Sequence, residues 1–387
     1  MSVILRPHVP PFAGTRAAPL DTSAPWEPAE GGGGVRVPTV RLSTGAFARA
    51  LAALQRDSDP ASGAFMTSVG LNVLRYETLA SGGRLALVES AATTGAKNNR
   101  NRAGSGWNAG SSVVETSGQI GPDGVASAYR EEVSSGGFSP WLTTVATSGP
   151  FVASQWIKRG GANTSKHAQA YNGAIFTHSE SDTGLTAVWQ RDVIRIATGT
   201  SGTYVPVDGR TGAVIAAGAR DVVSDLVQLE AGRFATSAII NATGASLTRP
   251  ADTLTWAAAP AALLSQRCGF DHVRPIFTST LEVVNGDAFW LLSIGGASDG
   301  IVLRQASGIL TIDAVVGGVT RAQSQPLATL ADETLGSVVW DPAAGVIYVD
   351  GTPGPTGTPW TWSAGALRVG GIYGGAGEAC CGLSDIY

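Results

Sequence analysis

The segments VQLEAGRFATSAII at 227–240 and TRPAD at 248–252 decide the fold of this chain. An apolar run leads into Glu230-Ala231-Gly232, and a second short apolar run follows before the chain continues into polar residues. Strands bounded by Gly and polar turn residues show this pattern. We interpret the two segments as the last strand of a β-sandwich, which is closed off before a second domain begins.

The composition favours short strands joined by many turns. The chain has 387 residues, enough for two or three domains, and 43% of them are hydrophobic, which is ample for packed cores. It contains 51 Gly and 20 Pro together with many Ser and Thr residues, while only 14% of the residues are charged. An all-β protein with frequent turns has this profile.

Charge and targeting signals argue against nucleic-acid and membrane functions. The net charge of -4 gives no electrostatic reason to expect nucleic-acid binding, which needs a basic face. The apolar run before Pro7 is too short for a signal peptide. The longest stretch of low polarity, 256–264, is too short to span a bilayer and contains Pro260. We therefore expect a soluble protein, assembled in a cytoplasm and without membrane insertion.

Few residues offer catalytic or metal chemistry. The three cysteines, Cys268, Cys380 and Cys381, contain no pair with metal-binding spacing. We expect buried thiols, with a bridge from Cys268 to one of the tail pair as the alternative. The four histidines nearly exclude a histidine triad or a three-histidine metal site, and no phosphate-loop, nucleophile-elbow or zinc-protease motif occurs. The sequence therefore predicts no enzyme activity, no metal site and no cofactor.

The N-terminal part divides into two predicted regions. Residues 1–38 are rich in Pro and contain four consecutive glycines at 31–34, so they are expected to form an extended arm. Apolar residues recur in the arm, which favours ordering on a partner over a disordered leader. Residues 39–83 are predicted to be a lead-in region with short strands. A short amphipathic helix is an alternative over 42–56, where Ser43 could cap it.

The sequence pattern of residues 84–250 predicts one jelly-roll sandwich. The segment FVASQWIK at 151–158 alternates large and polar residues and ends in a Gly160-Gly161 turn. Successive strands at eight-to-twelve-residue spacing are typical of a sandwich. Further strands are expected at 170–177, 185–190, 192–197, 213–217 and 221–229.

Residues 251–387 predict a second sandwich. In SVVWDPAAGVIYVDG at 337–351, two alternating strands are joined by an Asp-Pro turn. Earlier strands are expected at 289–294, 300–304 and 308–312. The predicted fold class is therefore all-β, with two consecutive β-sandwich, jelly-roll-like domains preceded by an extended N-terminal arm.

Several of these segments resemble known families. The pattern QLEAG.F.TS.I at 228–239, followed by TR.AD at 248–252, resembles the end of a carbohydrate-binding-module-like jelly roll in bacteriophage proteins. Such modules occur in tail fibres and head spikes of tailed phages and of phage-like particles, including gene transfer agents. The segment 91–94, Ala-Ala-Thr-Thr, departs from the usual Arg-Thr-Asn, which leaves the domain boundary near residue 90 soft. The hairpin 340–351 resembles that of concanavalin A and laminin-G-like sandwiches.

The resemblance implies a function on the virion surface. It implies a non-enzymatic head spike or tail fibre that attaches the particle to host cell-surface polysaccharide. The N-terminal arm would bind other virion proteins, and the chain would form a homo-oligomer, often a trimer in such proteins. A structural calcium ion occurs in some members of both sandwich families, although no ligands can be named here. A purely structural capsid decoration or spike-base protein is the first alternative, and a capsule depolymerase is the second.

Tryptophans are the candidate glycan-binding residues. Flat aromatic faces stack on sugars, and polar side chains complete such sites. Trp360 and Trp362 stand at i and i+2 of an extended segment, so they could form one platform, or else both could cover the sandwich core. Asn99 and Arg102 belong to a polar cluster near Trp107, which could instead be a solvated loop.

A second set of tryptophans and a few acids have other predicted roles. Trp156, Trp189, Trp290 and Trp340 lie within alternating strands, so they are expected in the cores. A glycosidase needs two carboxylates about 5–10 Å apart. The candidates here are Glu131-Glu132 and Glu180-Ser181-Asp182, which are otherwise solvated turn residues.

Overall fold

The structure is a computed structural model that describes residues 45–48, 53–56, 66–69, 74–78, 84–89, 91–104, 106–144, 150–162, 169–171, 176–178, 185–196, 202–207, 220–232, 235–275, 288–327, 337–370, 381–383 and 386. The predicted arm, 1–38, lies outside these residues. Within them, the chain forms 29 strands and one short helix, α1 (Ala261–Ser265). The all-β sandwich prediction is therefore confirmed. No helix in the described part of the chain has the length and apolar character needed to cross a membrane.

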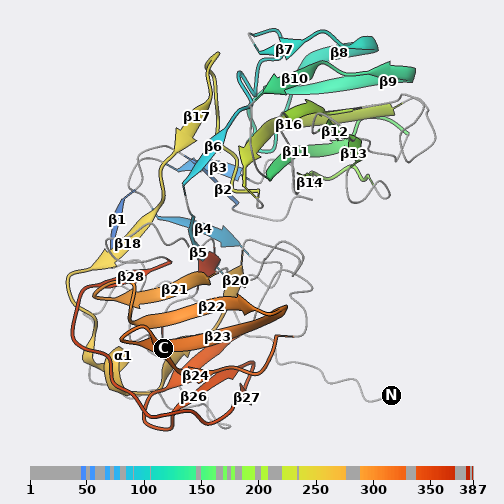
Figure 1. The fold of residues 1–387 in the computed structure, drawn as a ribbon. Coiled ribbons are helices and arrows are strands. Elements are labelled where there is room, and N and C mark those ends of the chain that lie inside the picture. The colour runs from blue at the N-terminus through green and yellow to red at the C-terminus, as the bar shows by residue number, and fades with distance from the viewer. Residues whose placement is uncertain are drawn as a thin grey trace.

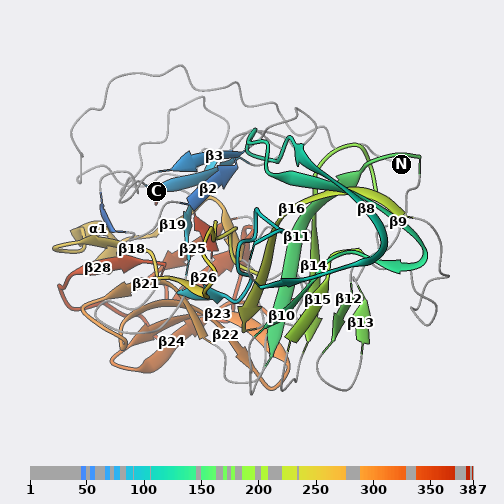
Figure 2. The same ribbon diagram turned by 90° about the horizontal axis from the view of Figure 1, so that it is seen from above.

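The first sandwich consists of two sheets (Figure 1). One has the order β14-β11-β16-β6-β17, with β9 paired to β16 and β8 paired to β9, and the other has the order β13-β12-β15-β10-β7. Figure 2 shows β8 and β9 as a long curved ribbon at one margin. The bounds are β6 Ala92–Thr94, β7 Trp107–Asn108, β8 Ser111–Gln119, β9 Ala128–Phe138, β10 Trp141–Thr144, β11 Phe151–Arg159, β12 Gln169–Tyr171, β13 Phe176–His178, β14 Gln190–Ile196, β15 Gly202–Val205, β16 Arg220–Ala231 and β17 Leu247–Arg249.

The core of the first sandwich follows from strand alternation. Alternate residues of a strand point to opposite faces, so Phe151 and Ala153 of β11 face inward with Leu229 of β16. They pack against Leu142 and Tyr204 of the facing sheet. This packing identifies the two sheets as the layers of one sandwich.

The second sandwich has three sheets around one core. Their orders are β1-β18-β28-β21-β22-β23-β24, β19-β25-β26-β27 and β20-β29-β5-β4. The core contains Trp340 and Phe270 with Leu303, Val369 and Leu383. The bounds are β1 Ala46–Ala48, β4 Arg75–Thr78, β5 Arg84–Val88, β18 Thr253–Trp256, β19 Cys268–Phe270, β20 Val273–Pro275, β21 Ala288–Ile294, β22 Gly300–Ala306, β23 Ile309–Val316, β24 Val319–Gln323, β25 Val338–Asp341, β26 Val346–Val349, β27 Thr352–Pro353, β28 Leu367–Val369 and β29 Cys381–Leu383.

Two strands of the lead-in region, β1 and β4, belong to sheets of this second sandwich. β1 pairs with β18, and β5 pairs with both β4 and β29. The helix considered over 42–56 is wrong, because the described residues of that stretch form β1 and β2 (Ala53–Arg56). Pairing with other strands outweighs local helix propensity in both segments. β2 pairs only with β3 (Met66–Val69) among the described strands, and Met66 packs on the first sandwich.

The chain therefore enters and leaves the first sandwich between strands of the second. The predicted start of the first sandwich at residue 84 falls too early, because β5 pairs with strands of the second sandwich. The first strand that joins a sheet of the first sandwich is β6, which pairs with β16 and β17. This result agrees with the soft boundary expected near residue 90.

Strand predictions are confirmed where an alternating segment is bounded by clear turn residues. The predicted hairpin at 337–351 appears as β25 and β26, in register from Val338 with Val349 to Asp341 with Val346. The strand predicted at 170–177 is instead two short strands, β12 and β13. No strand occurs from Leu185 to Trp189, whose buried apolar side chains belong to an irregular segment. The strand predicted at 213–217 lies outside the described residues.

The Gly- and Pro-rich segment 354–359 lies directly against β24. The backbone N–H of Gly357 donates to the carbonyl of Gly345 at 2.8 Å, and that of Thr358 donates to Arg321 at 2.9 Å. A Cβ atom placed on Gly357 would lie 2.0 Å from the Arg321 carbonyl oxygen. Glycine is therefore required here by close approach of two backbones.

We expect Gly357→Ala to lower the free energy of unfolding by about 1–3 kcal/mol, the usual cost of overpacking. Denaturant unfolding measures this loss. Gly296→Ala is the matched control, because no atom lies within 4 Å of a Cβ placed there. A loss of the same size in both variants would contradict the proposed backbone contact.

Candidate functional site

Trp360 and Trp362 do not form an exposed platform. Trp360 is 6% exposed and Trp362 is 2% exposed, and both belong to the core of the second sandwich. Their rings are 5.7 Å apart at an interplanar angle of 66°, an edge-to-face arrangement. The Trp362 indole N–H donates to the carbonyl of Val315 at 2.7 Å. The predicted exposure is wrong, and the alternative that both residues cover the core is correct.

The alternation predicted in this segment is confirmed, since Thr361 is exposed between two buried tryptophans. The i, i+2 spacing places both rings on one side but does not say whether that side faces solvent. For the tryptophans expected in the cores, the prediction is largely confirmed. Trp189, Trp290 and Trp340 are buried, whereas Trp156 is partly buried.

The polar cluster near Trp107 is not a solvated loop either. Asn99 is 3% exposed, and its side-chain amide donates to the Ile239 carbonyl at 2.7 Å. Its side-chain oxygen accepts from the backbone N–H of Asn241 at 2.9 Å. Asn99 therefore holds the segment after β16 in place, and these bonds occupy its polar atoms.

Arg102 and Trp107 are brought together by the fold. The Arg102 guanidinium lies 5.1 Å from the centre of the Trp107 ring and 5.2 Å from that of Tyr129. Such cation–π contacts are favourable, more so when desolvated. The Trp107 indole N–H also donates to the carbonyls of Lys97 and Asn98, at 3.0 and 3.2 Å. The ring is partly buried and its orientation is held from several directions.

Two carboxylates complete the Arg102 site. The guanidinium forms an ion pair with Glu131, donates to the Ser224 hydroxyl at 2.5 Å, and lies 3.8 Å from a Glu115 oxygen. Glu115 and Glu131 face each other in the register of β8 and β9. Burial raises the pKa of Glu115, Arg102 lowers it, and the nearby Glu131 raises it further. The side chain of Glu115 keeps 29% exposure, so its carboxyl stays accessible to a ligand.

The site lies where the edges of the two sheets of the first sandwich approach each other. Trp107 begins β7, the last strand of the five-stranded sheet, while Tyr129 and Glu131 alternate on β9 of the other sheet. Sequence reasoning found Arg102 and Trp107 but missed Glu115 and Tyr129. Alternation along β9 places the side chains of Tyr129 and Glu131 on the same face of the strand. No sequence signal shows that this face contacts Arg102.

Glu131 and Glu132, the described carboxylates among those considered for a glycosidase, do not combine into a catalytic pair. The Glu131 side chain is fully buried, and its oxygens are occupied by Arg102 and the Ser224 hydroxyl, which donates at 2.9 Å. Neighbouring Glu132 is 50% exposed beside Arg130, at 3.4 Å, as expected of a solvated pair. Glu180 and Asp182 lie outside the described residues.

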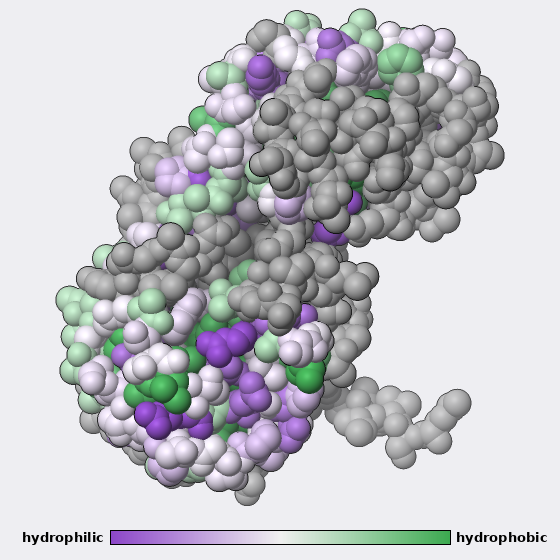
Figure 3. Space-filling model, in the orientation of Figure 1, coloured by the Kyte–Doolittle hydropathy of each residue, from purple (hydrophilic) through white to green (hydrophobic). Residues whose placement is uncertain are grey.

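The rest of the described surface shows no second cluster of aromatic and polar residues that we identify as a candidate binding site. The exposed large hydrophobic side chains are Val114, Ile120, Val125, Ile309 and Val319. On the face seen in Figure 3, hydrophobic and hydrophilic residues of the described regions are interspersed. Among the described residues, no group of three or more His, Cys, Asp or Glu side chains could hold a metal ion.

Cys268 is buried, and its thiol donates to the carbonyl of Ala262 at 3.4 Å. The bridge considered between Cys268 and the tail pair stays a prediction, because Cys380 lies outside the described residues.

No family model matches the chain, and no curated protein matches it.

Proposed function

We propose that this chain is a non-enzymatic surface protein of a phage or phage-like particle that binds host polysaccharide through its first sandwich. The observation that carries the proposal is Trp107, a partly exposed aromatic ring that packs against the core of the first sandwich and is held between Arg102 and two backbone carbonyls. A ring that is already ordered loses little side-chain entropy when a sugar stacks on it. The all-β sandwich fold, which suits a display module, supports the same function.

Glu115 supplies the polar part of the proposed site. Glycan sites combine an apolar face with a few placed polar groups. The partly exposed Glu115 carboxyl lies 3.8 Å from the Arg102 guanidinium, which also pairs with Glu131 and lies over the Trp107 ring. It can accept hydrogen bonds from sugar hydroxyls while the ring contacts the apolar side of the sugar.

The position on the virion rests on the resemblance of the sequence motifs. The proposal includes a location on the surface of a head spike or tail fibre, assembly as a homo-oligomer, and anchoring of residues 1–38 to other virion proteins. No nucleic acid and no membrane insertion are part of it. A structural capsid decoration protein is the alternative that the binding experiment separates.

The test is binding of the purified protein to bacteria with intact capsule or lipopolysaccharide and to strains stripped of each. We expect saturable binding that is lost on stripped cells. Trp107→Ala should weaken it by about tenfold, equivalent to roughly 1.4 kcal/mol, within the range of aromatic contacts. Trp141→Ala is the matched control, because Trp141 is also partly buried but lies next to Leu142, the register partner of Trp107. It therefore points to the opposite face of the sheet.

Glu115→Gln tests the same site with little risk to the fold, since the change is isosteric. It should weaken binding while the melting temperature stays close to that of the wild type. Negligible binding of the wild-type protein to all strains would reject the adhesin and favour the structural alternative. Equal losses in Trp107→Ala and Trp141→Ala would reject this site.

A further inference from the structure

The chain crosses between the two sandwiches twice, and the two crossings lie side by side. It passes from β5 to β6 through 89–91 and from β17 back to β18 through 250–252. The backbone N–H of Asp252 donates to the Glu89 carbonyl at 2.8 Å, and the N–H of Glu89 donates to the Asp252 carboxylate at 3.3 Å. On the side of the first sandwich, β6 and β17 continue the contact as a paired ribbon. The crossings are thus bonded to each other rather than independent linkers.

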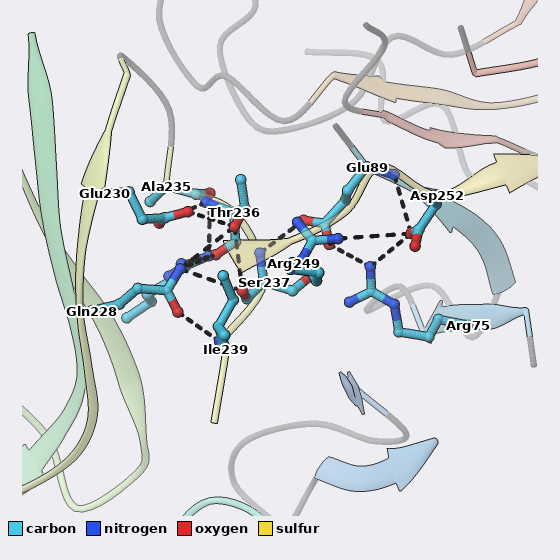
Figure 4. A network of polar contacts seen from close by, with 11 residues as sticks. Arg75, Glu89, Gln228, Glu230, Ala235, Thr236, Ser237, Ile239, Arg249 and Asp252 are labelled. Carbon is cyan, nitrogen blue, oxygen red and sulfur yellow. Dashed lines mark hydrogen bonds and ion pairs between the residues drawn. The ribbon is translucent and has the colours of Figure 1, made fainter. Parts of the chain in front are cut away.

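Four buried charged side chains surround this crossing (Figure 4). Arg75 and Asp252 are 0% exposed, and Glu89 and Arg249 are 1% exposed. Arg75 forms an ion pair with Glu89 and lies 3.1 Å from Asp252, while Arg249 lies 3.1 Å from Glu89 and 3.8 Å from Asp252. Two cations therefore balance two anions. Burial opposes ionisation of Glu89, but Arg249 and Arg75 together hold the pKa of its carboxyl well below the usual range.

Hydrogen bonds connect the four charged side chains to the first sandwich through Ser237. The backbone N–H of Ser237 donates to Glu89 at 2.7 Å. The neighbouring Thr236 donates to Glu230 through its backbone, at 3.1 Å, and through its hydroxyl, at 2.6 Å. The Gln228 side-chain oxygen accepts from the backbone N–H of Ile239 at 2.7 Å. Figure 4 shows these contacts as a continuous path from Gln228 and Glu230 to Arg75.

This path gives the residues of the sequence pattern QLEAG.F.TS.I a structural role. Val227 and Leu229 of β16 point into the core, so Gln228 and Glu230 project from the opposite face. There they bind the returning segment 235–240 with side chains instead of a strand ladder. The TR.AD sequence then supplies Arg249 and Asp252 to the crossing. The conspicuous residues of both segments thus serve a single connection.

We propose that Glu89, Arg75, Arg249 and Asp252 form a buried clamp that makes the two sandwiches one rigid body. The clamp joins β4 and β5 of the second sandwich to β17 and the 235–240 segment of the first. Separating the sandwiches would expose buried charges that are paired in this arrangement, so one orientation is favoured. The inference stands whether or not Trp107 binds a glycan.

The test compares the full-length wild type with Glu89→Gln by calorimetry and small-angle X-ray scattering at neutral pH and matched oligomeric state. We expect one unfolding transition for the wild type. Glu89→Gln keeps a hydrogen-bond acceptor for Ser237 but removes the charge that pairs with both arginines, so it should give two resolved transitions and a larger radius of gyration. Glu132→Gln, which changes an exposed carboxylate, is the matched control and should leave both readouts unchanged.

Two results would overturn the clamp. One is a wild type that already melts in two separate transitions, and the other is a Glu89→Gln variant with the cooperativity and dimensions of the wild type. If Glu89→Gln does not fold, Arg249→Lys provides the same readouts, because it keeps the charge but loses the planar fork. Unchanged cooperativity and dimensions in Arg249→Lys would then reject the proposal, and split transitions would support it.

Discussion

Replacing Arg102 with Ala is expected to lower the free energy of unfolding by about 3–5 kcal/mol, the usual cost of leaving one partner of a buried ion pair alone. Glu131 is fully buried and would keep only the Ser224 hydroxyl among the partners described here. Trp107 and Tyr129 would also lose the cation between them. Denaturant unfolding followed by tryptophan fluorescence measures the loss.

Arg130→Ala is the control for this prediction. Arg130 is on the same sandwich and pairs with Asp221 at 2.7 Å, but its side chain is 38% exposed, so solvent screens the pair. A small change is expected there. If the two arginine variants were destabilised equally, burial would not explain the contribution of the Arg102 ion pair to stability. A joint Arg102→Ala, Glu131→Gln variant should recover part of the loss, because it removes the unpaired charge.

Trp362→Ala should destabilise the second sandwich by about 3–5 kcal/mol, as expected when a large aromatic residue is removed from a core. The ring packs edge-to-face against Trp360 in the core, and its N–H bond to Val315 would be lost as well. Thr361→Ala, an exposed change at the adjacent position, should alter stability by no more than about 0.5 kcal/mol.

The Trp362 experiment also separates core packing from glycan binding. A binding platform would lose affinity in Trp362→Ala while its melting temperature stayed the same. A core residue gives the opposite result, with a lower melting temperature and unchanged binding by the remaining folded protein. Loss of binding without loss of stability would therefore contradict the packing described here and restore the platform that the sequence suggested.

The candidate site could be predicted only in part. The closeness of Trp107 and Arg102 in the sequence draws attention to both, and the fold brings their side chains together. Partners on β8 and β9 were not predictable, because a sandwich edge brings them together through pairing and packing rather than through sequence proximity. Buried polar groups are usually bonded, yet a sequence does not say which Asn or Arg is buried. For this reason the sequence suggests Asn99 as a ligand-binding residue, whereas in the structure its side chain holds the segment after β16.

The amino-acid sequence by itself determined the all-β class and the local hairpin at 338–349, because alternation and turn chemistry act over a few residues. Only the tertiary structure decided that β5 joins β29, almost 300 residues later, and that Trp360 and Trp362 face inward. It also decided that Glu230, Arg249 and Asp252 serve the connection between the sandwiches. Local sequence patterns set which residues share a face, whereas the partner of that face is chosen by long-range pairing and burial.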